Sequence, residues 1–282
     1  WLDDGYKCQF DEMIPYAQAK GVPLWVGVSP EKMGGSHSAG GAYVQPVLNY
    51  ASWEQVQQAH QTGDVLVGTH SLAADAMNAA TDAAVAEEMR SRIQPMYARG
   101  LVNGLEHYAL PGGQAQSLAS AAALDEYFKH FAVVRGVSPW YQETPTGFIA
   151  PTADPAYASG SCPLRPVGRF WGSAHQIQTS GSSSDYATQL NHAIACKAHK
   201  IFYAHGLTED SDYFITSRAA WRGFIDAVAG ARDAGLLDII TPQNWYEGTF
   251  DLPVTRPVHD NASPDPGNAG AIPVAPSGSV AL

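Results

Sequence analysis

The sequence predicts an α/β fold, and the order of its segments favours a β/α barrel over an open sheet. Short runs rich in β-branched, aliphatic and aromatic residues alternate with amphipathic stretches of helical length, which is the pattern of parallel strands joined by helices. The expected strands cover residues 22–28, 65–70, 105–110, 132–137, 201–205 and 237–241. The expected helices cover residues 11–20, 52–62, 81–99, 115–131, 182–200 and 216–234.

Three of the expected helices carry an end signal in the sequence. Gly21, Gly63 and Gly100 each follow the last residue of a helical stretch. Glycine is frequent at that position because it adopts the left-handed conformation without a steric penalty. Thr81 followed by the acidic Asp82 is in turn typical of a helix start.

Composition divides the chain into two parts. Residues 1–250 carry the alternating pattern and are predicted to form one domain. Residues 251–282 are rich in Pro, Gly and Ala and show no helical period, so we expect a tail or linker there. Within the domain, the stretch 139–166 is rich in Pro, Gly, Ser and Thr and is predicted to be a long loop near the barrel mouth.

The charge balance narrows the classes of partner. With 16 Lys and Arg against 27 Asp and Glu, the chain carries a formal net charge of -11. Such a chain repels phosphate backbones, so we expect no nucleic-acid partner. No apolar run approaches the length that spans a bilayer, and no signal peptide is visible within this chain. Because the chain opens abruptly at Trp1, on what reads as a core strand, we expect the natural polypeptide to begin earlier.

Two adjacent carboxylates, Asp3 and Asp4, stand near the start of the chain and are followed by Gly5. In β/α folds functional groups gather at the carboxyl ends of the strands, and this pair is expected to lie at such an edge. One carboxylate could bind a metal while its neighbour acts as a base. The alternative is a plain turn at the end of a strand, because Asp-Gly is a common turn pair.

Two further strands are expected to end in a histidine. His70 closes the apolar run 65–70, and His205 closes the run 201–205. An imidazole in that position can be a metal ligand or a general acid–base group, while a hydrogen-bonded core histidine is the alternative for each. Two such endings, together with the acidic pair in the same structural position, indicate a site assembled at one end of the fold.

The order of these motifs is similar to that of the NodB-homology polysaccharide deacetylases, carbohydrate esterase family four. Residues 2–5, Leu-Asp-Asp-Gly, resemble the opening Thr-Phe-Asp-Asp-Gly motif of the family, and the strand into His70 resembles the segment that carries its metal-binding histidine. Residues 105–113 resemble the strand and Pro-Gly turn that follow, and the run around His205 resembles the closing histidine motif. The likeness covers about residues 1–250, in the order of the family.

The resemblance implies a distorted (β/α) barrel of the NodB-homology type, with a polysaccharide deacetylase-like catalytic domain over residues 1–250. It implies a divalent metal, Zn²⁺ by expectation, that is held by Asp4 and His70. Asp3 would be the general base, and His205 the general acid that protonates the leaving amine. The substrate would be an acetylated polysaccharide or glycan that loses N- or O-linked acetyl groups, in an extracellular, periplasmic or cell-envelope setting.

The second motif of the family departs from its pattern in this chain. The family carries two histidines four residues apart, but Ala74 stands four residues after His70. Asp75, shifted by one residue, is the expected third metal ligand, and His107 or His37 could approach from neighbouring loops instead.

Residues expected near the barrel mouth are the candidates for binding sugar. Trp140 and Trp171 could stack on sugar rings, although aromatic residues in such segments also serve core or loop packing. His107 and Pro111 belong to the segment that resembles the strand and turn after the metal-binding histidine. The arginine-containing form of the third motif is absent around Pro111, so the sequence shows no group that orients Asp3.

Two rival functions remain open from the sequence. A barrel that has lost its metal would be a degenerate, non-catalytic carbohydrate-binding or structural module. A glycoside hydrolase would use paired carboxylates such as Asp3 and Glu106. A zinc site on one helix face, formed by His192, Cys196 and His199, is a further option, but a partly buried helix face explains that spacing without a metal.

Overall fold

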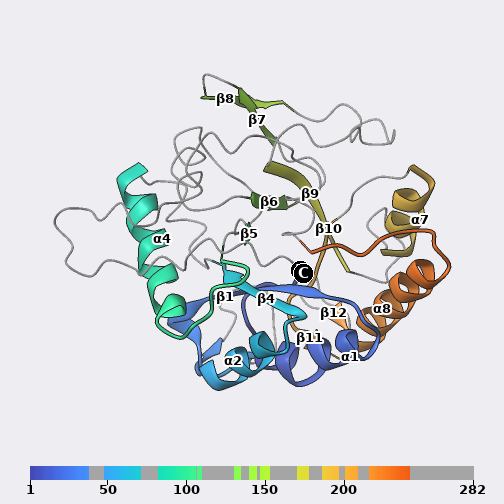
Figure 1. Ribbon diagram of the computed structural model, residues 1–282, viewed down its shortest axis with the longest axis horizontal. Helices are drawn as coiled ribbons and strands as arrows, with labels where there is room; N and C mark the ends of the chain where they lie inside the picture. Colours follow the sequence, from blue (N-terminus) through green and yellow to red (C-terminus); the bar gives the residue numbers. More distant parts are fainter. Residues whose placement is uncertain are drawn as a thin grey trace.

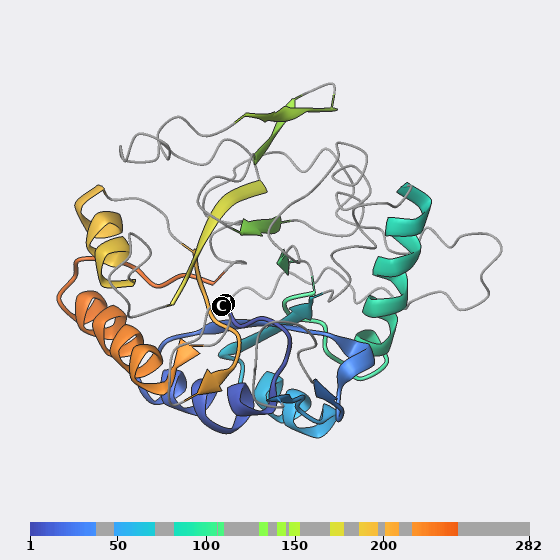
Figure 2. The ribbon, with the colours of Figure 1, turned by 180° about the vertical axis from the view of Figure 1, so that it is seen from behind.

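Parallel strands occupy the centre of the molecule, and helices lie around them (Figure 1). The computed structural model describes residues 1–37, 48–70, 82–105, 107–109, 130–134, 140–144, 147–152, 170–177, 186–196, 201–208 and 216–241. Over these residues the architecture is mixed α/β, as the sequence predicts. Seen from behind, the helices again line the periphery and the strands again fill the middle (Figure 2).

The parallel strands belong to two sheets. In the first, β1 (Leu24–Val28) pairs with β4 (Val65–Thr69). The second has the strand order β10–β9–β6–β5. The bounds of its strands, in that order, are Ile201–Tyr203, Phe170–Gln176, His130–Val134 and His107–Ala109.

Leu2 joins the two sheets. It forms parallel bridges with Val26 of β1 on one side and with Ala204, just after β10, on the other. The Leu2 carbonyl accepts a hydrogen bond from Gly27 N at 2.8 Å, and Asp3 N donates to the Ala204 carbonyl at 2.9 Å. The residues just before the acidic pair therefore lie between β1 and β10, in the position of a central strand.

Leu2 thus gives the combined strand order β4–β1–Leu2–β10–β9–β6–β5. Its two end strands, β4 and β5, also approach one another. β4 lies beside β5, and Val67 N in β4 donates to the carbonyl of Asn103 at 3.0 Å. Further along, His70 Nδ1 lies 2.9 Å from the carbonyl oxygen of Ala109, the last residue of β5. The carboxyl ends of β4 and β5 are thus linked through a side chain.

Side-chain caps explain where two of the helices begin. α2 (Trp53–Gln61) starts with a capping box in which Ser52 Oγ accepts from Gln55 N at 3.3 Å and Gln55 Oε1 accepts from Ser52 N at 3.0 Å. α8 (Arg218–Asp233) starts after Ser217, whose hydroxyl accepts from Ala220 N at 3.1 Å. Both helices fall within the ranges predicted from the sequence.

The helices bury apolar faces against the strands. η1 (Gln9–Met13), a π-helical turn, leads directly into α1 (Ile14–Ala19), and together they bury Phe10 and Ala17 as well as Met13 and Ile14. α8 buries a stripe that includes Trp221 and Ile225. α4 (Asp82–Tyr97) and α7 (Tyr186–Cys196) complete the outer layer in the described part of the chain. No helix there is both long and apolar enough to cross a membrane.

Three short pairings lie outside the two main sheets. β7 and β8 form an antiparallel hairpin, β2 and β3 pair antiparallel, and β11 and β12 pair parallel. The bounds of these strands, from β2 to β12, are Ser36–His37, Leu48–Asn49, Trp140–Thr144, Gly147–Thr152, Leu207–Thr208 and Thr216–Ser217. η2 (Pro30–Lys32) is a single 3₁₀ turn.

The structure corrects the sequence prediction at several elements. The expected loop 139–166 contains the β7–β8 hairpin, and the strand β9 was not expected at all. The strand expected at 132–137 begins two residues earlier, so it includes the last two residues of the helix expected at 115–131. Residues 237–241 are not a strand. Leu237 and Ile239 pack on the core while Ile240 faces outward, and no other described strand pairs with this run.

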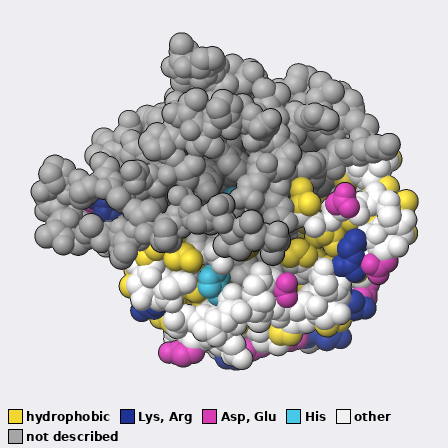
Figure 3. Space-filling model, viewed as in Figure 1, with side chains coloured by type: hydrophobic (Ala, Val, Ile, Leu, Met, Phe, Trp, Pro, Cys, Tyr) yellow, Lys and Arg dark blue, Asp and Glu magenta, His cyan; other side chains and the backbone are white. Residues whose placement is uncertain are grey.

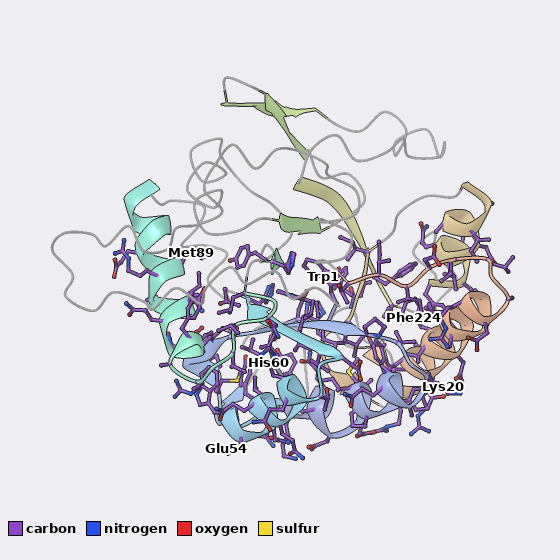
Figure 4. All side chains as sticks on the ribbon, in the orientation of Figure 1. Trp1, Lys20, Glu54, His60, Met89 and Phe224 are labelled. Atoms are coloured by element: carbon purple, nitrogen blue, oxygen red, sulfur yellow. The ribbon has the colours of Figure 1, made fainter. Side chains whose placement is uncertain are left out.

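Two indoles pack against each other near the centre of the fold, at an interplanar angle of 38°. The rings of Trp1 and Trp25 lie with their centroids 4.4 Å apart, and Trp25 Nε1 donates to the carbonyl of Gly104 at 3.0 Å. Figure 4 shows Trp1 among the central side chains. Trp25 also lies directly against Gly27 and Gly68, which face each other in the β1–β4 pair. These two strands therefore need glycine, because any side chain there would occupy the volume of the indole.

On the surface, charged side chains of both signs lie near one another. On the face seen in Figure 3, acidic and basic side chains are interspersed over the described residues. Two ion pairs show the arrangement: Lys20 Nζ lies 2.7 Å from Asp226 Oδ1, and Arg218 Nε lies 2.7 Å from Glu12 Oε2. The exposed Lys20–Asp226 pair adds little to stability.

Replacing Gly68 by Ala should destabilise the fold. Its Cβ would lie 2.8 Å from the Gly104 carbonyl oxygen and would overlap the Trp25 ring. We expect a loss of about 1–3 kcal/mol in the free energy of unfolding, which urea denaturation measures. The matched control is Gly230→Ala, in the exposed interior of α8, where nothing lies within 4 Å. That variant should gain roughly 0.5–1 kcal/mol, and equal effects at both positions would contradict this account.

Candidate functional site

Asp3 and Asp4 lie at a tight turn, and both carboxylates are buried. Asp3 is 3% exposed and Asp4 6% exposed. The backbone of Asp4 has φ +79° and that of Gly5 has φ +82°, so two successive residues adopt the left-handed region. A residue other than glycine rarely adopts it, although Asp tolerates it better than most. The pairing of Leu2 with β1 continues as far as the Asp4 carbonyl, which accepts from Ser29 N at 3.4 Å, and the chain turns at Asp4 and Gly5. The two carboxylates meet different partners.

Asp4 faces His70. The distance from Asp4 Oδ1 to His70 Nε2 is 3.6 Å, and both side chains are buried. This separation is too long for a hydrogen bond. It is close to the roughly 3.4 Å that separates two donors of one tetrahedral Zn²⁺, when each bond is about 2.0–2.2 Å.

The backbone holds His70 in the orientation that a metal ligand needs. Nδ1 lies 2.9 Å from the carbonyl oxygen of Ala109, which can only accept, so in the neutral ring the proton is on Nδ1. The lone pair of Nε2 is then directed to the side of Asp4. The backbone of His70 is fixed as well: its N donates to Val28 O at 2.8 Å, and its carbonyl accepts from Ser29 Oγ at 2.7 Å.

Asp3 faces His205. Its Oδ2 lies 3.9 Å from His205 Nε2, and the Asp3 side chain is 4% exposed whereas that of His205 is 17% exposed. The other carboxylate oxygen, Oδ1, is buried and accepts no hydrogen bond from the described residues. The His205 ring stands edge-on to the ring of Tyr203, with the centroids 5.4 Å apart. The site therefore holds a buried carboxylate with an unused oxygen next to an imidazole that reaches the surface.

One residue of the site, Gln9, was missed by the reasoning from sequence. Its side chain is fully buried, and its Nε2 donates to the backbone carbonyls of Asp3 and His205. A signal for it existed. Gln9 stands on the same helical stripe as Met13 and Ala17, so a polar side chain occupies a position that the pattern reserves for apolar ones.

Two stacked tyrosines form a wall beside Asp4. The ring centroids of Tyr6 and Tyr50 lie 5.0 Å apart with an interplanar angle of 27°, and both residues are buried. Burial first, and then the negative charge of Asp4, raise the pKa of Tyr6 above its ordinary value. The same two causes raise the pKa of Tyr50. Both phenols therefore stay protonated over the working pH range and add no charge next to the carboxylate.

The remaining predicted site residues are placed only in part. His107 is the first residue of β5 and is 1% exposed, so it is a core side chain. Trp140 and Trp171 belong to β7 and β9, where the structure describes the backbone. Asp75 and Pro111 lie outside the described residues, as does Glu106 of the rival carboxylate pair.

The described residues bring together two pairs rather than a complete metal cluster. Across the described ranges, no group of three or more His, Cys, Asp and Glu side chains is arranged to hold a metal ion. His37 ends β2, and His192 and Cys196 lie in α7, but the structure does not describe their side chains. The alternative metal sites therefore stay predictions, as does Asp75 as third ligand.

Comparison with solved structures shows the class of fold. The chain is similar to a candidate polysaccharide deacetylase from Mycobacterium smegmatis, with a TM-score of 0.53 and 13% identity over 86% of this chain and 77% of that one. This likeness establishes the fold: the chain has the fold of a polysaccharide deacetylase. The resemblance seen in the sequence is thereby confirmed at the level of the fold, and the low identity makes the chain a divergent example.

Two further structures were found with lower scores. A family 4 carbohydrate esterase from Streptomyces lividans has a TM-score of 0.48 and 12% identity, over 86% of this chain and 92% of that one. IcaB from Ammonifex degensii has a TM-score of 0.40 and 15% identity, over 46% of this chain; the chain spans 57% of the length of IcaB. No protein-family model matches the sequence. No curated protein matches it either.

The raised phenol pKa values predict a loss of stability in alkali. The unfolded chain loses a proton from each tyrosine near pH 10, whereas the folded chain keeps Tyr6 and Tyr50 protonated, so folding is favoured less as pH rises. We expect the free energy of unfolding to fall above pH 10 by up to about 1.4 kcal/mol per pH unit for each phenol. Urea denaturation between pH 9 and 11 measures the slope. Tyr6→Phe should reduce this slope by the contribution of one phenol. An unchanged slope would contradict the raised pKa of Tyr6.

Proposed function

We propose that this chain is a metal-dependent hydrolase that removes acetyl groups from a polysaccharide. One observation carries the proposal. Asp3 and Asp4 follow Leu2 directly, and each of them faces a histidine that follows a different strand. Asp3 Oδ2 lies 3.9 Å from His205 Nε2, and Asp4 Oδ1 lies 3.6 Å from His70 Nε2. Deacetylation needs both an acid–base pair and a metal-binding pair, and this turn supplies one of each.

The residues present fit a divalent metal on the Asp4 side of the turn. Asp4 Oδ1 and His70 Nε2 would hold it, and the hydrogen bond from Nδ1 to Ala109 fixes the ligating nitrogen. Asp75 is the proposed third ligand. When bound, Zn²⁺ polarises the acetyl carbonyl and lowers the pKa of an attacking water.

The pair on the other side of the turn would move the protons. Asp3 has a buried oxygen that accepts no hydrogen bond from the described residues, so it can take a proton from the attacking water. The water oxygen forms a bond to the carbonyl carbon, and the bond from that carbon to the sugar nitrogen or oxygen then breaks. His205 is the more exposed partner and would deliver the proton to the departing amine or hydroxyl. The products are acetate and the free sugar group.

The strand order supports closure of the sheet into a barrel. β4, β1, Leu2, β10, β9, β6 and β5 follow one another, and β4 and β5 lie side by side. We infer that these seven positions form a distorted (β/α) barrel, with the site at the carboxyl ends of its strands. An extracellular or cell-envelope setting suits a polysaccharide substrate and belongs to this proposal.

Amide variants of the two aspartates should separate the roles. Asp4→Asn removes the metal-binding charge and should weaken Zn²⁺ binding at least about 100-fold, together with deacetylation. Asp3→Asn should keep Zn²⁺ binding close to wild type and lower kcat by about 10²–10⁴. Calorimetric titration of the chelator-treated protein measures the metal, and acetate release from an acetylated glycan measures the reaction.

The matched control is Asp226→Asn, which removes a surface carboxylate paired with Lys20. It should leave both readouts unchanged. Acetate release by Asp4→Asn at the wild-type rate would contradict the proposal. An equal loss of metal binding in Asp3→Asn and Asp4→Asn would contradict it as well.

A sugar-binding module that has lost its metal is the second candidate, because the described residues supply two metal ligands and not three. Under this alternative, the wild-type protein binds acetylated glycans on an array and releases no acetate at saturating Zn²⁺. Acetate release that stops on addition of chelator and returns with Zn²⁺ would exclude it.

A further inference from the structure

We infer that Gln9 is a positioning residue that sets the spacing between Asp3 and His205; the inference rests on the hydrolase proposed above. Gln9 Nε2 donates to the carbonyl oxygen of Asp3 at 2.5 Å and to that of His205 at 2.7 Å. Because both acceptors are carbonyls, the NH₂ end of the amide must face them. A single side chain thus connects the backbone of the proposed base to the backbone of the proposed acid.

The amide continues the pairing of two strands past the point where their backbones separate. The last ladder bond between them runs from Asp3 N to the Ala204 carbonyl at 2.9 Å. After His205 the chain turns toward β12, where the Gly206 carbonyl accepts from Thr216 N at 3.0 Å. Gln9 supplies the donors at the position where the backbone of β10 leaves, so it holds the two strand ends together at the site.

The surroundings hold Gln9 in one place. It is 0% exposed and is the first residue of η1, and its backbone N donates to the Tyr6 carbonyl at 3.0 Å. A π-helical turn of this kind is frequent at functional sites. Gln9 Oε1 is buried and has no donor among the described residues. An apolar residue would avoid that cost, so a requirement for packing alone does not explain the glutamine.

The influence of Gln9 should fall on one pair only. Its acceptors are the carbonyls of Asp3 and His205, the two residues of the proton-transfer pair, although the Asp3 carbonyl is also in the peptide unit that leads into Asp4. The Asp4–His70 pair is held by other bonds, among them His70 Nδ1 to the Ala109 carbonyl and Ser29 Oγ to the His70 carbonyl. Loss of the Gln9 donors should therefore disturb proton transfer and leave metal binding in place.

Gln9→Met tests the inference, because methionine keeps the length of the side chain and removes both donors. We expect kcat for acetate release to fall about 10–100-fold, since small displacements of reacting groups cost that much. KM and the Zn²⁺ affinity should stay within about twofold of wild type, because a positioning defect leaves ground-state binding unchanged. Crystal structures should show a separation of Asp3 Oδ2 and His205 Nε2 that departs from 3.9 Å, with the Asp4–His70 distance preserved.

The control is Gln18→Met, the same change at a partly exposed glutamine of α1 whose amide donates to Thr62 Oγ1. It should match wild type in every readout. Gln9→Asn, which keeps an amide but is too short to span both carbonyls, is the second variant should Gln9→Met fail to fold. Its kcat should lie between that of the wild type and the value expected for Gln9→Met.

The outcomes distinguish a failure of the proposed role of Gln9 from a failure of the proposed hydrolase function. An unchanged kcat and an unchanged Asp3–His205 separation in Gln9→Met would overturn the inference, as would a parallel loss of Zn²⁺ affinity. A wild-type protein that binds Zn²⁺ but releases no acetate would contradict the proposed function instead. In that case the crystal structures alone decide the role of Gln9: a changed separation supports it, and an unchanged one overturns it.

Discussion

The site depends on the backbone pairing of Leu2 between two strands. Parallel bridges to Val26 and Ala204 place this residue in a central strand position, with no exposed surface. The next two residues are then held at the carboxyl end of the sheet, and the left-handed backbone of Asp4 sends the neighbouring carboxylates to different partners. Asp3 meets the imidazole that follows β10, and Asp4 meets the one that follows β4. A shift of this strand by one residue would break both pairs at once.

The gathering of the four candidate site residues at one end of the fold could be predicted because it depends on strand ends. His70 and His205 each close an apolar run, and the acidic pair follows another strand position, so parallel strands had to bring them to one edge. Distances and tautomers could not be predicted, since the Ala109 carbonyl that fixes His70 belongs to a residue with no polar side chain. Gln9 was missed for the same reason: its partners are backbone carbonyls, which every residue carries.

The errors in the fold have a common physical origin. β9 (Phe170–Gln176) lacks a strong local strand pattern, but it lies between β6 and β10 and completes its hydrogen bonds with both. Residues 237–241 show the opposite case, a short run rich in aliphatic residues that pairs with no other described strand. Long-range pairing decided both outcomes, and a single sequence records it only weakly. The helices were predicted better because their caps, such as Ser52 and Ser217, are local.

The central claim is that the turn after Leu2 divides its two carboxylates between a metal and a proton-transfer pair. A crystal of the Zn²⁺-soaked protein, measured with anomalous scattering at the zinc absorption edge, tests it most directly. We expect one strong peak within about 2.0–2.2 Å of both Asp4 Oδ1 and His70 Nε2, with Asp3 and His205 outside the coordination sphere. A peak on the His192 and Cys196 face of α7, or no peak at the turn, would contradict it.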